Sequence, residues 1–180
     1  MSHTLFNLSI LTVIATVLGG CGLTQTVTEG TASATETIFY KQVKTLHLDF
    51  NARTTLNTDI ADMSALSLPT LVRVYQLRDS KALDRATYEG LVNGDDGLLD
   101  GVLLDKRAVV VKPGAGAQLS VPMDPQARVV ALVGLFRRPD AQLDTWRLML
   151  TRDELDPDRA RLIEMGDNQL FLRPLRRSEP

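Results

Sequence analysis

The run ARVVALVGLF at residues 127–136 constrains the fold of this chain more than any other segment. It is apolar for almost its whole length, so both of its faces must be covered by other parts of the protein. A short continuous apolar run of this kind is typical of a central β-strand. The sequence therefore predicts a β-rich core around residues 127–136.

Other segments show the patterns of further strands. KTLHLDF alternates Leu46, Leu48 and Phe50 with polar residues, as a half-buried strand does. Residues 70–77 are rich in β-branched and aromatic side chains, and one short helix is predicted within residues 80–94. Five more strands are predicted in LLDKRAVVVKPG, AQLSV, TWRLML, ARLIEM and NQLFLRP. The fold class is mainly β, an antiparallel two-sheet β-sandwich with a short helical insertion.

Composition and motifs exclude several functions. The 20 Lys and Arg residues nearly balance the 22 Asp and Glu residues, so no nucleic-acid partner is expected. A single cysteine allows no internal disulfide and no Cys/His zinc cluster. The only histidine beyond the N-terminal region is His47, and no serine lies in a G-x-S-x-G motif. We expect no enzyme activity, catalytic residue, metal site or bound cofactor.

The N-terminal region has the layout of an export signal. Residues 5–18 carry no charge and are too few to span a bilayer comfortably. They end in LGGC, which resembles the lipobox of bacterial lipoproteins. The resemblance implies that residues 1–20 are a signal peptide and that Cys21 carries a covalent lipid. Because Gly22 follows the cysteine in place of aspartate, the resemblance also implies lipid anchoring in the outer membrane, facing the periplasm.

The remaining chain divides into three parts. Residues 21–42 are predicted to be the lipidated cysteine and a flexible tether, because they contain many Thr, Ser, Gly and Ala residues and few large apolar ones. Residues 43–175 are predicted to form the β-sandwich domain, and residues 176–180 a C-terminal tail.

The connection between the first two predicted strands is unusually long. At about 18 residues it exceeds the 4–6 residues typical of compact domains. It also carries five large apolar side chains, at Leu56, Ile60, Met63, Leu66 and Leu68. Two interpretations stay open: the connection binds a partner, or it folds back over the edge of the sandwich.

The order of the motifs resembles the TssJ lipoprotein family of the bacterial type VI secretion system. Behind the lipobox and the tether, the matching elements are Leu56-Asn57-Thr58-Asp59, Pro69 to Leu77, Leu83 to Leu91, Val110 to Gly114, Val130 to Arg137 and Trp146-Arg147. The match spans nearly the whole chain.

The resemblance implies a transthyretin-like sandwich that connects other proteins. In this family the long loop binds the periplasmic C-terminal domain of TssM, and through it the TssL/TssM inner-membrane complex. By position, the implied contact residues here are Arg53, Thr54, Leu56, Asn57, Asp59, Ile60, Met63, Leu66 and Leu68.

An alternative is a periplasmic lipoprotein carrier, or a pilotin-like chaperone, that binds an apolar ligand or a pore subunit. An open apolar cavity would favour this alternative. A filled core with an exposed long loop would favour the connector.

Overall fold

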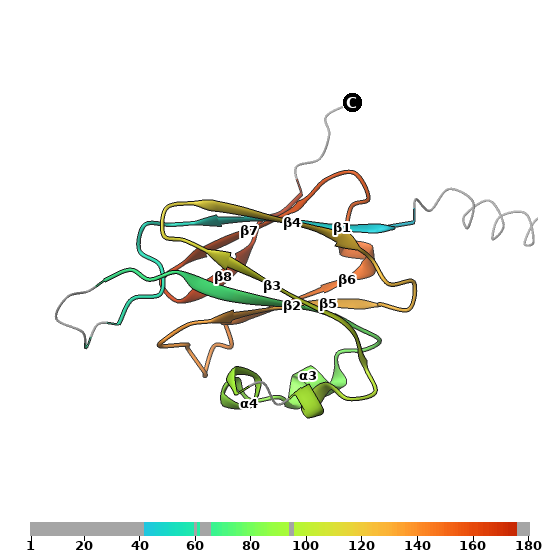
Figure 1. Ribbon diagram of the computed structural model, residues 1–180, viewed down its shortest axis with the longest axis horizontal. Coiled ribbons are helices and arrows are strands. Elements are labelled where there is room, and N and C mark those ends of the chain that lie inside the picture. The colour runs from blue at the N-terminus through green and yellow to red at the C-terminus, as the bar shows by residue number, and fades with distance from the viewer. Residues whose placement is uncertain (1–41, 60, 62–65, 94–95, 176–180) are drawn as a thin grey trace, which may run out of the picture. The chain divides into compact units, whose positions relative to one another are not determined.

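The computed structural model describes residues 42–59, 61, 66–93 and 96–175. Two four-stranded sheets pack face to face (Figure 1), which confirms the predicted sandwich. Sheet A has the order β4-β1-β7-β8 and sheet B the order β3-β2-β5-β6. The strands are β1 Thr45–Ala52, β2 Thr70–Leu77, β3 Leu103–Val111, β4 Gly116–Pro122, β5 Val129–Leu135, β6 Arg147–Thr151, β7 Arg161–Gly166 and β8 Gln169–Leu172.

Several predictions concern residues outside these ranges. They are the signal peptide at 1–20, Cys21, the tether up to residue 41, Ile60, Met63 and the tail at 176–180. These stay predictions.

One strand pair differs from the prediction of a wholly antiparallel sandwich. β1 pairs with β7 in parallel, from Leu48 opposite Arg161 to Ala52 opposite Met165. The chain crosses from β6 in sheet B through the short 3-10 helix η2, Arg152–Glu154, and then enters sheet A beside β1 in the same direction. Sheet A is therefore mixed.

The core lies between the two sheets and is filled by side chains. Leu46, Leu48 and Phe50 of β1 point inward and are almost completely buried. Residues 130–133 of β5 are buried on both faces of sheet B. This confirms the predicted central strand, which lies between β2 and β6.

The predicted single helix is instead two short helices, α3 Lys81–Arg85 and α4 Tyr88–Val92, followed by the 3-10 helix η1, Asp96–Leu99. The break falls at Ala86 and Thr87, which both have extended backbone. Thr87 caps α4 by accepting a hydrogen bond from the backbone of Gly90. Among the described residues, no helix has the length and apolarity needed to cross a membrane.

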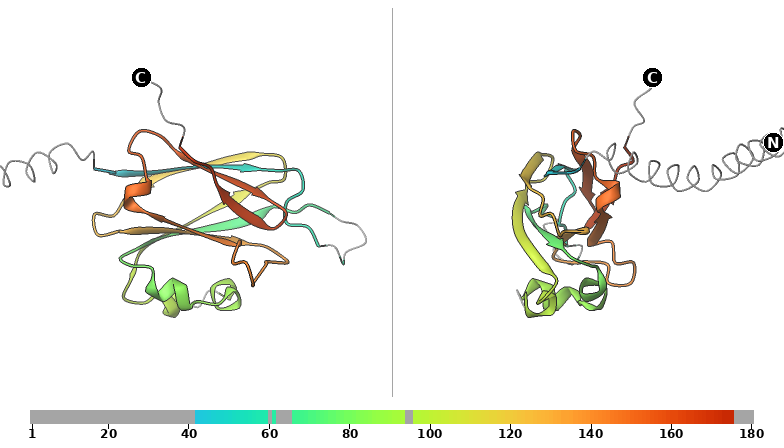
Figure 2. Two further views of the ribbon diagram at one scale, coloured as in Figure 1. Left: turned by 180° about the vertical axis from the view of Figure 1, so that it is seen from behind. Right: turned by 90° about the vertical axis from the view of Figure 1, so that its right-hand side faces the viewer.

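The helical insertion lies against the outer face of sheet B (Figure 2). Two arginines of this sheet hold it. Arg147 Nη1 donates to the carbonyl oxygen of Leu83 at 2.7 Å, and the Arg73 guanidinium donates to that of Leu91. The insertion therefore covers the apolar outer face of β5.

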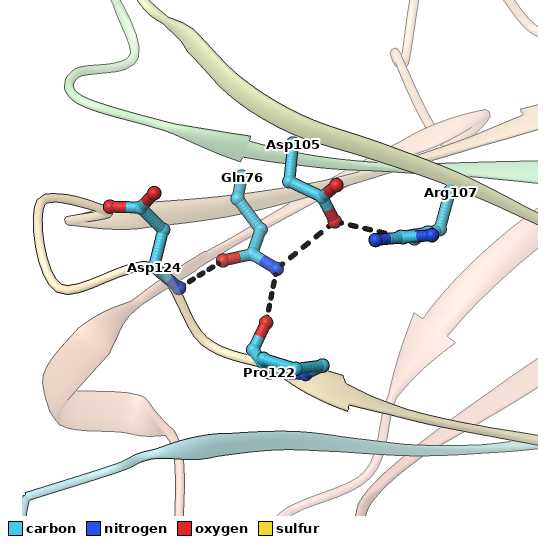
Figure 3. Close-up of polar contacts among 5 residues, drawn as sticks. All are labelled: Gln76, Asp105, Arg107, Pro122 and Asp124. Carbon is cyan, nitrogen blue, oxygen red and sulfur yellow. Dashed lines mark hydrogen bonds and ion pairs between the residues drawn. The ribbon is translucent and has the colours of Figure 1, made fainter.

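A buried amide joins the two layers at the end of the sandwich where the chain enters (Figure 3). Gln76 of β2 donates from Nε2 to the carbonyl oxygen of Pro122 at 2.9 Å and to Asp105 Oδ2 at 3.4 Å. Its Oε1 accepts from the backbone N–H of Asp124 at 2.7 Å. Asp105 also pairs with Arg107 Nε at 3.0 Å. Every polar atom of this buried side chain is thus hydrogen-bonded.

Pro113 and Gly114 lie in the turn between β3 and β4. Gly114 has a φ of 67°, and the backbone N–H of Ala115 donates to the carbonyl oxygen of Lys112 at 3.1 Å. Proline followed by a glycine of positive φ is the signature of a type II turn. The turn leads from β3 in sheet B to β4 in sheet A, so it joins the two sheets rather than a hairpin within one.

Candidate partner-binding surface

The β1–β2 loop, residues 53–69, is fixed to the sandwich at its base. The backbone N–H of Arg53 donates to the carbonyl oxygen of Met165 at 2.8 Å, and that of Gly114 donates to the carbonyl oxygen of Arg53 at 3.1 Å. The N–H of Leu68 donates to the carbonyl oxygen of Leu56 at 3.1 Å, which closes the neck of the loop. These hydrogen bonds give the base of the loop a defined position on the sandwich.

Two predicted contact residues hold the loop rather than face a partner. Leu56 is completely buried in the core. Asn57 is buried with a φ of 52°, a left-handed conformation that asparagine tolerates better than most residues. Asn57 Nδ2 donates to the carbonyl oxygen of Pro69 at 3.3 Å, and its Oδ1 accepts from the backbone N–H of Arg137 at 2.7 Å. Both side chains therefore act in folding.

Other predicted contact residues are exposed. The side chain of Leu66 is 58% exposed and that of Leu68 is 38% exposed. Arg53 and Thr54 are exposed on the opposite arm of the loop. This arm lies beside a surface hollow of about 580 Å³, whose lining includes Gly114, Glu164 and Arg173. The loop thus has a part that folds back onto the sandwich, at Leu56 and Asn57, and a part that is exposed. That the exposed part binds a partner stays a prediction.

Asp59 ties the loop to the start of the β5–β6 loop, residues 136–146. Its Oδ1 lies 3.0 Å from Arg138 Nε, and its Oδ2 lies 3.8 Å from Arg137 Nη2. The carboxylate also accepts from the backbone N–H of Ala61 at 3.0 Å. That hydrogen bond and the two arginines hold the pKa of Asp59 below its usual value, against the opposing effect of desolvation.

The β7–β8 turn supports the loop from the other sheet. Asp167 and Asn168 both have positive φ, which is typical of a type I′ hairpin turn. The N–H of Asp167 donates to the carbonyl oxygen of Thr55 at 3.0 Å, and Asn168 Nδ2 donates to that of Thr58 at 2.9 Å. The β1–β2 loop, the β5–β6 loop and the β7–β8 turn therefore meet at one end of the sandwich, on the left in Figure 1.

Sequence reasoning missed the two arginines of this end. In the sequence Arg137 and Arg138 resemble ordinary solvated charges, because they are scattered among acidic residues without interleaved aromatic ones. Their partner Asp59 lies almost 80 residues earlier in the chain. The available signal was their position directly after the central strand, where a loop must begin.

This end of the molecule offers exposed leucines on a fixed backbone, with ion pairs beside them. Such a mixture of apolar and charged groups is typical of protein-binding surfaces. In the part of the chain that the structure describes, no group of three or more His, Cys, Asp or Glu side chains could hold a metal ion. The fold and the surface define a protein-binding β-sandwich.

Comparison with known proteins identifies the family. The sequence profile of the type VI secretion lipoproteins, which include VasD, EvfM and TssJ, matches residues 44–169. The chain belongs to this family, as its motifs predicted. No curated protein matches the chain in sequence.

Solved structures of similar chains agree with this assignment. A chain in a structure described as "Type VI membrane complex" is 41% identical to this chain, with a TM-score of 0.69. The match covers 74% of this chain and 100% of that one. A chain in "T6SS protein TssM C-terminal domain (869-1107) from EAEC" is 38% identical, with a TM-score of 0.66 and the same coverage. The lipoprotein TssJ1 from Pseudomonas aeruginosa is 24% identical, with a TM-score of 0.57 over 73% of our chain and 98% of its own, and shows a shared fold.

Proposed function

We propose that this protein is an outer-membrane-anchored periplasmic lipoprotein that tethers the type VI secretion membrane complex by binding the C-terminal domain of TssM. The β1–β2 loop makes the contact, and the lipid on Cys21 holds the other end of the link. The role is that of a connector and not of an enzyme.

The observation that carries this proposal is the path of β1. β1 begins on the side of the domain where the described chain enters, and it ends on the opposite side, where the β1–β2 loop starts (Figure 1). The eight residues of β1, at about 3.3 Å each, set the two ends of this strand about 25 Å apart. A tether that leads to the membrane and a loop that holds a partner are thus joined by one strand.

That strand is well secured. β1 pairs with β4 on one edge and with β7 on the other. At its entry, Arg152 Nη2 donates to the carbonyl oxygen of Val43 at 2.8 Å, and the N–H of Met123 donates to that of Lys44 at 2.9 Å. Tension between the anchor and the loop would act along a strand that is hydrogen-bonded on both sides.

The filled core supports the connector over the carrier. Phe50, Leu132, Leu150, Ile163 and Met165 are completely buried in the core. The described hollows of about 690, 580 and 490 Å³ have charged residues in their linings. In addition, two solved structures, described as the TssM C-terminal domain and as the type VI membrane complex, contain chains that match this one over their full length.

The loop is tested by replacing residues 58–67 with a short Gly-Ser linker, which leaves Leu56, Asn57 and Leu68 in place. We expect the variant to lose co-purification with the TssM C-terminal domain of the same bacterium while its urea unfolding stays cooperative. A control replaces residues 157–159, at the opposite end of the sandwich, with Gly-Ser-Gly and should bind normally. Unchanged binding by the 58–67 variant would contradict the proposal.

The anchor is tested separately by Cys21→Ser. Acyl chains contribute about 0.8 kcal/mol per buried methylene, so their loss should move the protein from the outer-membrane fraction to the soluble periplasm. The measurement is made in cells that lack TssM. Membrane retention of the variant there would count against lipidation.

A further inference from the structure

Leu143, in the β5–β6 loop, is the most exposed of the exposed large apolar side chains among the described residues, at 68%. It lies at a turn and not within a strand. A single exposed leucine is ordinary on a protein surface. What distinguishes Leu143 is how firmly its backbone is held and what lies beside it.

The turn that carries Leu143 is built by two aspartates. Asp140 Oδ1 accepts from the backbone N–H groups of both Gln142 and Leu143, each at 2.9 Å. Asp144 has a φ of 52°, and its Oδ2 pairs with Arg147 Nη2 at 2.6 Å. A side chain on such a turn loses little backbone freedom when it binds, so more of its burial energy appears as affinity.

The two ends of the β5–β6 loop are held by one residue of the helical insertion. Tyr88 of α4 donates its hydroxyl hydrogen to the carbonyl oxygen of Phe136, where the loop begins. The ring of Tyr88 also meets the ring of Trp146, where the loop ends, at 5.2 Å between centroids and 74° between planes. Burial raises the pKa of Tyr88 to about 12, so the hydroxyl stays a donor at neutral pH. The insertion therefore fixes the loop on which Leu143 lies.

The β5–β6 loop is continuous with the β1–β2 loop. The N–H of Arg137 donates to Asn57 Oδ1 at 2.7 Å, and Arg138 Nε lies 3.0 Å from Asp59 Oδ1. Figures 1 and 2 show both loops projecting from the same end of the sandwich, away from the point where the chain enters. A protein that covers one loop is therefore placed to reach the other.

We propose that Leu143 is a second contact for the partner of the β1–β2 loop and inserts into an apolar pocket of the TssM C-terminal domain. This inference rests on the proposed function and adds the β5–β6 loop to the binding surface. The commitment to this partner comes from the continuity of the two loops. The ion pairs of Asp59 with Arg137 and Arg138 form the polar margin between the two apolar contacts.

The test compares Leu143→Ser with Leu143→Met and Met149→Ser in the full-length chain purified in detergent. Affinity for the TssM C-terminal domain of the same bacterium is measured by biolayer interferometry. Leu143→Ser should weaken binding by about tenfold or more, as loss of a buried apolar anchor does. Leu143→Met, which keeps the apolar volume, should stay within about threefold of the wild type. Met149, 41% exposed on β6 outside both loops, is the matched control and should bind like the wild type.

The outcomes separate this inference from the proposed function. All three variants should melt like the wild type, because exposed substitutions change stability by only about 0.5 kcal/mol. Binding of the wild type with undiminished binding of Leu143→Ser would overturn the role of Leu143 and leave the tether intact. Absence of wild-type binding would overturn both. If Leu143→Ser instead abolished self-association at unchanged TssM affinity, the occupant would be a second copy of this chain, and the inference would be wrong.

Discussion

Asn57 offers the sharpest test of how the binding end is held together. Its side chain joins the β1–β2 loop to Pro69 at the start of β2 and to Arg137 at the start of the β5–β6 loop. Asn57→Ala removes both hydrogen bonds and also leaves in the left-handed conformation a residue without the short polar side chain that makes it tolerable for asparagine. Asn57→Gly removes the same hydrogen bonds but tolerates the backbone, so the pair separates the two effects.

The magnitude follows from these two terms. Each lost hydrogen bond leaves a partner atom unpaired, at a cost of about 1–1.5 kcal/mol. The left-handed conformation costs alanine about 1 kcal/mol more than it costs glycine, even though alanine has the less flexible unfolded chain. We therefore expect a loss of about 2 kcal/mol for Asn57→Gly and of about 3 kcal/mol for Asn57→Ala.

The assay is urea unfolding followed by the fluorescence of Trp146, the only tryptophan of the chain, which is buried in the fold. The chain used begins at residue 21 and carries Cys21→Ser, so that it stays soluble. The slope of the transition should be unchanged, and only the midpoint should fall. A loss of about 3 kcal/mol should also lower the melting temperature by about 10 °C for a domain of this size.

Two results would refute the reasoning. If alanine proves as stable as glycine at position 57, the left-handed backbone carries no cost there. If both variants lose less than about 1 kcal/mol, the hydrogen bonds to Pro69 and Arg137 do not hold the loops together.

Three further predictions concern side chains that the structure places inside the fold or at the loop. Leu56→Ala should lower the free energy of unfolding by about 2–5 kcal/mol, because it leaves a cavity in the core. The folded variant should keep its affinity for TssM. A stable variant with weakened binding would show that Leu56 faces the partner. Asp59→Asn should make the free energy of unfolding less dependent on pH in the acid range. The pKa of Asp59 in the folded protein lies below its usual value of 3.8, so its charge stabilises the fold above that pH. This contribution disappears as the pH falls through the lowered pKa. Urea titrations at about pH 6, 4 and 3 should show the wild type losing more stability than the variant, and equal losses would contradict this. Gln76→Leu should cost about 2–3 kcal/mol by leaving the backbone groups of Pro122 and Asp124 unpaired, as measured by urea unfolding, and a neutral result would mean that this amide does not join the layers.

The regular elements could be predicted because their signals are local. β1 alternates apolar and polar residues, and β5 is apolar throughout. The pattern of adjacent residues therefore predicts which faces of each strand are buried. β2 has the bounds of the segment rich in β-branched and aromatic residues, 70–77. The helical segment was located correctly, but the break at Thr87 depends on a cap that its apolar spacing does not reveal.

The binding end could be predicted only in part. An unusually long loop was visible in the sequence, yet Leu56 resembled Leu66 and Leu68 there, and only packing shows that Leu56 is buried while the other two are exposed. Composition cannot tell the buried leucine from the exposed ones, because an apolar side chain in a loop can either pack into the core or lie on the surface.

The sequence by itself determined the strands, the central apolar core, the helical insertion and the family. The tertiary structure decided the parallel pairing of β1 with β7, and which connections meet at one end. The contacts of Asn57 with Arg137, and of Asp59 with Arg138, join segments about 80 residues apart. Such contacts depend on the order of strands in two sheets, whereas periodicity reports only which face of one strand is buried.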